Sequence, residues 1–280
     1  MGERLCVVVL TEPKHPPRHG PASAVYERGR GNILAEALMT AGHSPVMWWD
    51  HPEGPLLPCE PDLVLLRSSK PIQLERARRR KSEGMVVIND PDAHEAASDK
   101  GSQEHVFCGQ GVAHPRSGAD LLAAGFAPST EVVVKPRHGS SGAEVRLSSL
   151  ALALGSVSST ELVQERLHGV EYRVTVVGGD AVAWAVKTPE EGEFRGNLRQ
   201  GAQMHDAPCP SREAESLARA AVEALGLEIG GVDLMMTAEG PVVIEVNAAT
   251  TLYGASKGST ARVLSSVITL VERSAASRLA

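Results

Sequence analysis

Two apolar runs near the carboxyl end decide the fold: Ile229–Met236 (IGGVDLMM) and Pro241–Asn247 (PVVIEVN), joined by the turn Thr237–Gly240 (TAEG). Apolar runs of this length, bounded by glycine and proline, are typical of adjacent strands. The short turn between them predicts a β-hairpin. Each strand also contains a carboxylate or an amide within otherwise apolar sequence, which is the feature that points beyond a plain structural hairpin.

The polar residues of this hairpin are expected on one face. Strand side chains alternate, so Glu245 and Asn247 should point one way and Ile244 and Val246 the other. Asp233 on the partner strand can share the face of Glu245 and Asn247. Three oxygen-bearing side chains are costly to bury unpaired, and a hard cation such as Mg²⁺ would satisfy them while leaving positions for phosphate. A half-exposed hairpin with ordinary polar residues outside explains the same pattern, and these residues alone do not separate the two interpretations.

Composition bounds the class of protein. The chain has 280 residues, of which 42% are hydrophobic, enough for two or three lobes with separate cores. A net charge of −6 argues against non-specific nucleic-acid binding, which needs a basic surface. The four cysteines form no C-x-x-C pair, so we expect reduced thiols in a cytoplasmic protein. No apolar run approaches the length of a membrane span, and we expect neither a nucleic acid nor a membrane as partner.

The first ninety residues alternate strand-like and helix-like patterns. Leu5–Leu10 is a continuous apolar run of the kind found in strands buried on both faces, and Asn32–Ala41 has helical periodicity. Further strands are predicted at Val46–Trp49, Asp62–Leu66 and Met85–Asn89. This alternation predicts a small parallel α/β lobe.

A run of basic residues from Arg76 to Lys81 interrupts this lobe. Charge runs are most often one solvated face of a helix, and we favour that interpretation. A docking patch for an acidic carrier or substrate is the alternative.

A glycine- and serine-rich turn follows the next predicted strand. Glu131–Pro136 carries Lys135 near its end, and Gly139–Gly142 follows directly. Glycine lets backbone N–H groups approach phosphate oxygens, and a lysine beside them adds positive charge. The pattern therefore suits a phosphate-covering loop, although a plain hairpin turn with a solvent-reaching lysine has the same sequence.

One familiar motif is set aside. Gly254–Gly258 matches G-x-S-x-G, but no strand runs directly into it and no histidine follows His205. A serine-hydrolase nucleophile elbow needs both features. No G-x-G-x-x-G follows the first strand, so a dinucleotide site is unsupported as well.

The ordered set of polar residues resembles the ATP-grasp superfamily, and within it the ligases that modify ribosomal protein S6 or the lysine-biosynthesis carrier protein, with glutathione synthetase more distant. The resemblance runs from about Ile88 to Gly258. It rests on Asp99-Lys100, Lys135 with its loop, Gln164-Glu165, Glu171, Arg173, Arg195, Asn197, Asp233, Glu245 and Asn247.

This resemblance implies an ATP-grasp fold of mixed α/β and α+β class, with ATP held between the last two of three lobes. The lobes would be a Rossmann-like α/β domain at 1–92, a small central subdomain at 93–166 and a C-terminal subdomain with the metal site at 167–280.

The resemblance also implies roles for individual residues. ATP would be bound by Lys100, Lys135, Gly139, Ser140, Ser141, Gly142, the adenine-hinge residues Gln164, Glu165, Arg166 and Leu167, and Glu171 at the ribose. The catalytic residues contacting phosphate and substrate would be Arg173, Arg195 and Asn197. Two Mg²⁺ ions, for which Mn²⁺ can substitute, would be held by Asp233, Glu245 and Asn247.

The implied activity is that of a carboxylate–amine ligase, which forms an amide through an acyl phosphate and releases ADP and phosphate. The acceptor would be an amino acid, a peptide or a carrier-protein terminus, and a homo-oligomer is compatible with the family. Two loops depart from it: residues 197–202 read NLRQGA where relatives usually have NLHRGG, and residues 248–254 read AATTLYG where relatives have a Ser-Ser/Thr-Pro-Gly sequence. Both loops face the acceptor in the family, so the substrate stays open. The alternatives are a kinase of the same superfamily acting on a small-molecule hydroxyl, and a non-catalytic ATP-binding protein.

Overall fold

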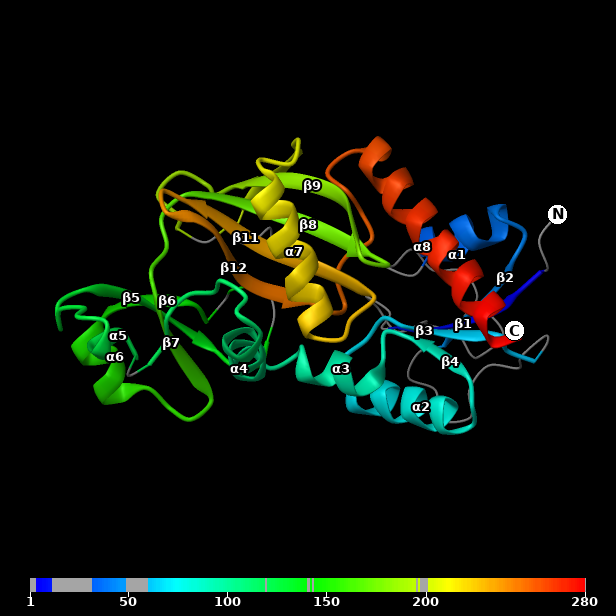
Figure 1. The fold of residues 1–280 in the computed structure, drawn as a ribbon, viewed down its shortest axis with the longest axis horizontal. Coiled ribbons are helices and arrows are strands. Elements are labelled where there is room, and N and C mark those ends of the chain that lie inside the picture. The colour runs from blue at the N-terminus through cyan, green and yellow to red at the C-terminus, as the bar shows by residue number, and fades with distance from the viewer. Residues whose placement is uncertain are drawn as a thin grey trace.

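The computed structural model describes residues 4–11, 32–48, 60–118, 120–139, 142, 144–194, 196 and 201–279. Within these residues the chain forms three sheets, one parallel and two antiparallel. The sheets follow one another along the long axis of the molecule (Figure 1). The predicted mixture of α/β and α+β structure is confirmed.

The N-terminal sheet is entirely parallel, as the alternation of strands and helices predicted. Its strand order is β2-β1-β3-β4, and every residue of β1 is buried. The elements are β1 (Cys6–Leu10), α1 (Asn32–Thr40), β2 (Ser44–Trp48), β3 (Leu63–Leu66), α2 (Pro71–Ser82) and β4 (Val86–Ile88).

The basic run lies on α2, and its cations have partners. These contacts are Arg76 over the ring of Trp48 at 4.8 Å, Arg78 with Asp92 and Glu95, Arg79 and Arg80 with Glu83, and Lys81 with Asp90. Most of these side chains are solvent-exposed or half-exposed, so the pairs stabilise the fold little. The arrangement fits the solvated helix face better than a docking patch.

The central part of the chain builds the smallest sheet, with order β6-β5-β7. Its core consists of a few aliphatic residues from the strands and from two short helices, among them Leu121, Val134 and Leu150. The elements between the first and last sheets are α3 (Pro91–Ala96), α4 (Lys100–Gln110), α5 (Asp120–Ala123), β5 (Glu131–Pro136), β6 (Arg146–Ser149), α6 (Leu150–Ser156) and β7 (Glu161–Glu165).

The C-terminal sheet is antiparallel and has the order β10-β9-β8-β11-β12. One face packs against α7, whose first turn is capped by the Ser211 hydroxyl, which accepts from the N–H of Ala214 at 3.1 Å. The elements are β8 (Val170–Val177), β9 (Asp180–Thr188), β10 (Gln203–Asp206), α7 (Arg212–Ala224), β11 (Ile229–Thr237) and β12 (Gly240–Asn247).

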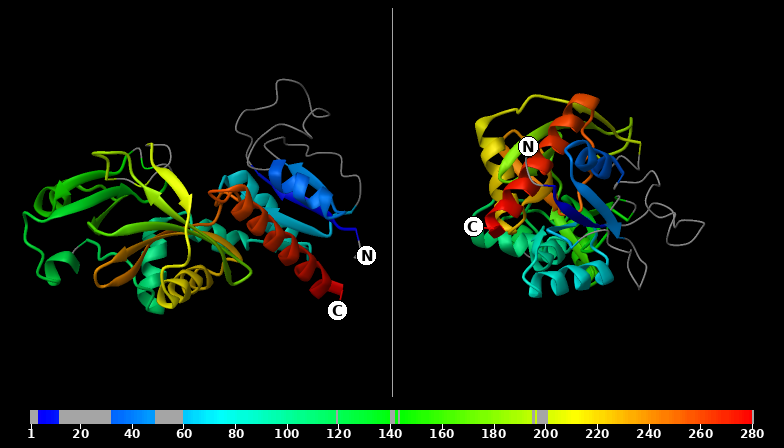
Figure 2. Two further views of the ribbon diagram at one scale, coloured as in Figure 1. Left: turned by 90° about the horizontal axis from the view of Figure 1, so that it is seen from above. Right: turned by 90° about the vertical axis from the view of Figure 1, so that its right-hand side faces the viewer.

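The last helix, α8 (Lys257–Leu279), returns to the N-terminal lobe. Val263, Val267 and Val271 are fully buried in a core that also contains Leu38 of α1 and Ile229 of β11. Figure 2 shows α8 lying alongside α1 and the parallel sheet. Helix α4 likewise crosses a boundary, since its Phe107 is buried in the core of the C-terminal sheet. The division at residues 92 and 166 therefore stays a proposal.

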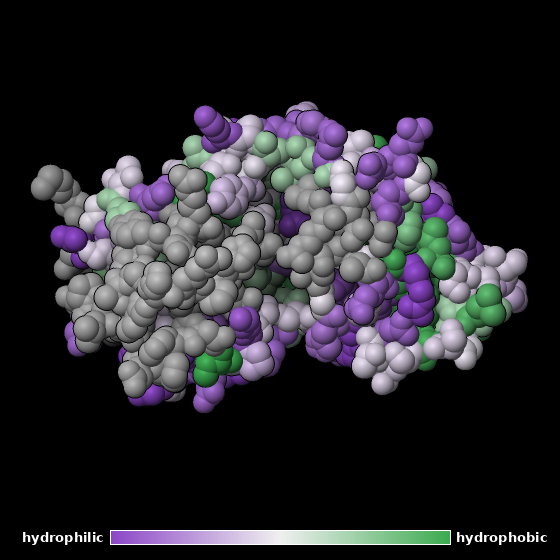
Figure 3. Space-filling model, turned by 180° about the vertical axis from the view of Figure 1, so that it is seen from behind, coloured by the Kyte–Doolittle hydropathy of each residue, from purple (hydrophilic) through white to green (hydrophobic). Residues whose placement is uncertain are grey.

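On the face shown in Figure 3, polar residues predominate among those that are coloured, with smaller apolar patches between them. The large exposed apolar side chains of the described residues, such as Leu122, Leu152 and Tyr253, are scattered over separate elements. Among the described helices, each is either too short or too polar to span a bilayer.

The packing of α1 against α8 predicts a contrast between two leucines. Leu38 is 0% exposed in that core, whereas Leu152 of α6 is 70% exposed. We expect Leu38→Ala to lower the free energy of unfolding by about 2 to 5 kcal/mol, because it leaves a cavity. Leu152→Ala should change it by less than about 0.5 kcal/mol. Urea titration of both variants measures this, and equal losses would contradict the assigned packing.

Candidate active site

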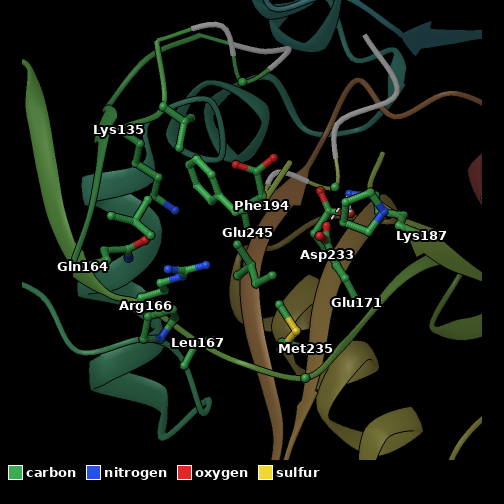
Figure 4. Close-up of a pocket in the computed structure, with 18 of the residues that line it drawn as sticks. Lys135, Gln164, Arg166, Leu167, Glu171, Lys187, Phe194, Asp233, Met235 and Glu245 are labelled. Carbon is green, nitrogen blue, oxygen red and sulfur yellow. Dashed lines mark hydrogen bonds and ion pairs between the residues drawn. The ribbon is translucent and has the colours of Figure 1, made fainter. Parts of the chain in front are cut away.

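A cavity of about 800 Å³ lies between the central and C-terminal sheets. Figure 4 shows Lys135 and Gln164 on one side of it and Glu171, Lys187 and Asp233 together on the other. This is the position in which the predicted fold would hold ATP.

One end of the cavity has apolar walls. Val133 lines it from the central sheet, and Met235 and Ile244 line it from the C-terminal sheet. The segment Gln164–Leu167, which links β7 to β8, runs along the same end, and its backbone leaves the ladder after Glu165. Apolar walls beside a backbone segment that has left the strand pairing can bind a heteroaromatic base. The assignment of this segment as the adenine hinge remains a proposal.

A β-bulge shapes this apolar end. The pairing of β11 with β12 shifts between Asp233 and Leu234, so that Ile244 has no direct partner. Bulges re-aim side chains, and here both Ile244 and the adjacent Glu245 line the cavity. The prediction that Ile244 shares the face of Val246 is therefore wrong, because strict alternation does not hold across a bulge.

Two lysines enter the cavity from the central part of the chain. Lys100 follows Asp99, which caps α4, and its Nζ donates to the carbonyl of Gly139 at 2.9 Å. Lys135 is buried, and burial lowers its pKa, with the carboxylate of Glu245 opposing that shift. Both lysines line the cavity together with Gly139 and Gly142, so the predicted lysine pair and the ends of the predicted loop do meet.

A buried charge cluster lies on the facing surface of the C-terminal sheet. Asp233 of β11 is flanked by Glu245 of β12 and Arg173 of β8. Arg173 donates to both carboxylate oxygens of Asp233, at 2.6 and 2.8 Å, and Lys187 of β9 approaches one of them at 2.8 Å. The Lys187 ammonium also donates to Glu171.

The cluster sets the protonation of its acids. Burial alone would raise the pKa of Asp233, but Arg173 and Lys187 outweigh it and hold that pKa at about 2. Glu171 differs, because burial raises its pKa and Lys187 only partly opposes this. Asp233 is therefore an anion at neutral pH, available to a cation that can displace its present partners.

The set of Asp233, Glu245 and Asn247 fits a hard metal ion. Asn247 donates through Nδ2 to Glu245 at 3.1 Å, which leaves its amide oxygen for another partner. Among the described residues no three His, Cys, Asp or Glu side chains form a cluster able to hold a metal by themselves. Mg²⁺ characteristically takes one or two carboxylates and completes its shell with phosphate and water. The metal role of these residues remains a proposal.

Several predicted residues lie outside the described part of the chain: Ser140, Ser141, Arg195 and Asn197. Conversely, sequence reasoning missed Lys187, which the structure places between two acids, and Phe194, whose ring lies 5.8 Å from the Arg166 guanidinium in the cavity. The sequence shows a lysine near the end of an apolar strand at position 187. Whether that lysine meets buried acids depends on which strand β9 pairs with and in what register, which the sequence does not show.

The chain is similar to known ATP-grasp proteins. A family model described as a RimK-like ATP-grasp domain matches residues 122–271. A probable alpha-L-glutamate ligase of Enterobacter sp. (strain 638) is 33% identical over 211 residues, covering 69% of each chain. A ribosomal protein bS6–L-glutamate ligase of Salmonella newport (strain SL254) is 32% identical over 211 residues with the same coverage.

Solved structures are similar along the whole length. The ATP-grasp ligase PsnB, in complex with a minimal precursor, Mg and ADP, has a TM-score of 0.66 at 20% identity, covering 96% of this chain and 97% of that chain. This likeness concerns the fold alone, and with the family match it confirms the predicted ATP-grasp architecture.

The cluster predicts strong coupling between Lys187 and Asp233. Lys187→Met should lower the free energy of unfolding by about 3 to 5 kcal/mol, because it leaves buried carboxylates poorly compensated. Combining it with Asp233→Asn should cost less than the sum of the two single changes. Thermal and urea unfolding of the three variants measure the coupling, with Lys257→Met at an exposed lysine as control. Simple additivity would contradict the buried pair.

Proposed function

The chain belongs to the RimK-like ATP-grasp family and is an ATP-dependent ligase that forms amide bonds, and we propose that it does so through an acyl phosphate. The observation that carries the proposal is one cavity lined by Lys100, Lys135 and Lys187 and by the acids Asp233 and Glu245. Such a set can bind a triphosphate and neutralise the charge that develops on phosphoryl transfer.

We assign the nucleotide to this cavity along its length. The base would lie against Met235 and Ile244 beside the segment Gln164–Leu167, with Glu171 near the ribose. Lys100 and Lys135 would contact the phosphates beneath the loop that begins at Gly139. These placements extend the site assignment made from the sequence, and the shared lining of the cavity supports them.

We propose that Asp233, Glu245 and Asn247 hold Mg²⁺, with two ions expected and Mn²⁺ able to substitute. When bound, the metal supplies positive charge to the phosphate oxygens and orients them. For the Asp233 carboxylate to bind Mg²⁺, the side chains of Arg173 and Lys187 must turn away from it and toward the phosphates of the nucleotide. The present ion pairs thus keep the two cations next to the place where phosphate charge would arrive.

The proposed reaction has two displacement steps. A carboxylate oxygen of the first substrate attacks the γ-phosphorus of ATP, the bond to the β-γ bridging oxygen breaks, and ADP leaves. The nitrogen of an amine then attacks the acyl carbon, loses a proton, and phosphate leaves with the bonding electrons. The protein contributes position and charge more than covalent help. Closure around the nucleotide would limit hydrolysis of the acyl phosphate by water.

The substrates are proposed by analogy with the relatives. Two relatives are named for ligating L-glutamate, one of them to ribosomal protein bS6, and PsnB was solved with a precursor peptide. We propose an amino acid as the amine and a peptide, a second amino acid or a carrier-protein terminus as the carboxylate. We further propose a cytoplasmic enzyme, without nucleic acid or membrane as partner, and leave a homo-oligomer open.

The proposed function is tested by ADP release with Mg²⁺ and ATP over a panel of amino acids and short peptides, with products identified by mass. We expect a product equal to two substrates less one water. A product equal to one substrate plus a phosphoryl group, stable and without amide, would instead indicate the kinase.

The metal assignment is tested by Glu245→Ala, with Glu239→Ala at the exposed turn of the same hairpin as control. Loss of a direct ligand should lower kcat by about 100-fold or more, since even indirect partners of metal ligands cost 10- to 100-fold. Unchanged turnover in Glu245→Ala would remove the metal role. The Glu239→Ala variant should keep the parent rate.

A further inference from the structure

The strand that carries Glu245 and Asn247 lies at an edge of its sheet. β12 pairs with β11 on one side and with no strand of the described chain on the other. An unpaired edge leaves backbone N–H and C=O groups without partners, which is costly where the edge is buried. Val246, between the two proposed metal ligands, is 1% exposed. Its outward backbone groups therefore need hydrogen-bond partners from elsewhere.

Gln103 of α4 supplies both partners. Its Nε2 donates to the carbonyl of Val246 at 2.9 Å, and its Oε1 accepts from the N–H of Val246 at 2.8 Å. The second hydrogen of Nε2 goes to the carbonyl of Ala97 at 2.7 Å. The side chain is 4% exposed, so these bonds are shielded from water. The side-chain amide of Gln103 thus makes the two hydrogen bonds to Val246 that the backbone of a neighbouring strand would otherwise make.

The same pattern continues along the chain. The carbonyl of Ala248 accepts from Nδ2 of Asn89 at 3.4 Å, and the carbonyl of Thr250 accepts from the Arg67 guanidinium. Every second carbonyl from Val246 to Thr250 is therefore bonded by a side chain from the first 103 residues. Asn89 also bonds the backbone of Ile229 at 2.7 and 2.8 Å, which ties the start of β11 to the same support.

We propose that Gln103 is a positioning residue for the metal site, fixing the backbone between Glu245 and Asn247. Alternate residues of a strand point to one face, so a rotation of the Val246 peptide groups would turn both flanking side chains away from their common target. Gln103 is not among the residues that line the cavity, so it would act on the site through its two hydrogen bonds to Val246. The inference rests on the metal role proposed above for Glu245 and Asn247.

A matched control separates positioning from simple stability. Gln73 of α2 is 1% exposed, and its Nε2 also donates to two backbone carbonyls, those of Thr11 and Trp48, each at 3.2 Å. It lies in the N-terminal lobe and touches no part of β12. Replacing either glutamine by methionine removes a buried amide of the same size. Both variants should lower Tm, but only one should affect metal binding.

The experiment titrates ADP by calorimetry at a series of Mg²⁺ concentrations. We expect Gln103→Met to raise the Mg²⁺ concentration for half-maximal ADP binding by about 10-fold, the usual effect of losing an indirect partner of a metal ligand. Metal-free ADP binding should stay at the parent level. Gln73→Met should show the parent Mg²⁺ dependence.

A second variant keeps the test decisive if Gln103→Met does not fold. Gln103→Glu keeps an acceptor for the Val246 N–H but faces its carbonyl with a second acceptor, so it should shift the Mg²⁺ dependence in the same direction. A parent-like dependence in the variant that folds would overturn the positioning role alone. No Mg²⁺ dependence in the parent protein would overturn the proposed metal site, and the positioning role with it.

Discussion

The structure depends on keeping one carboxylate, Asp233, charged inside a sheet. Burial opposes that charge, and the protein offsets it with two cations, Arg173 of the adjacent strand β8 and Lys187 of β9, the strand beyond it. Buried ion pairs rarely stabilise a protein more than apolar side chains of the same size would, so we ascribe this cluster to the chemistry of the cavity and not to the stability of the fold. The cluster places an anion beside cations that can change partners, on the wall of a cavity. The lysines from the central part of the chain then face a surface on which Arg173 and Lys187 need only exchange the Asp233 carboxylate for phosphate oxygens.

In the C-terminal sheet, the alternation of side chains along each strand places the charged residues of the cavity on one face and the apolar residues of the core on the other. Val174, Val176, Val232 and Leu234 lie in the core that contains α7, whereas Glu171, Asp233 and Met235 of the same two strands line the cavity. The bulge in β12 breaks this alternation, so that the consecutive residues Ile244 and Glu245 both line the cavity. In a regular strand, two consecutive side chains would point to opposite faces, and only one of them would line the cavity. The sheet thus combines a dry face and a polar face within eight or nine residues per strand.

Local pattern was enough to predict much of this. Three features could be inferred from alternation, turn residues and resemblance: the parallel first sheet, the hairpin of β11 and β12, and the presence of Lys100 and Lys135 in one cavity. What could not be inferred depends on pairing between segments distant in the chain. Lys187 matters because β9 lies beside β8 in one register, and Gln103 matters because α4 packs under β12. Neither relation leaves a periodic signal. The bulge at Ile244 was missed for a related reason, since hydrophobicity does not show where a strand gains a residue.

The return of α8 to the N-terminal lobe has a consequence for biosynthesis. The core shared by α1, the parallel sheet and α8 joins residues as far apart as Leu5 and Ala275. While the ribosome is still synthesising the chain, the apolar surface that α8 will cover has no partner, although the strands around it are already made. Domains generally fold in order from the N-terminus, but this one completes its core last. Until α8 has been synthesised, the apolar surface of the N-terminal lobe that it covers is exposed, and exposed apolar surface of this kind favours aggregation.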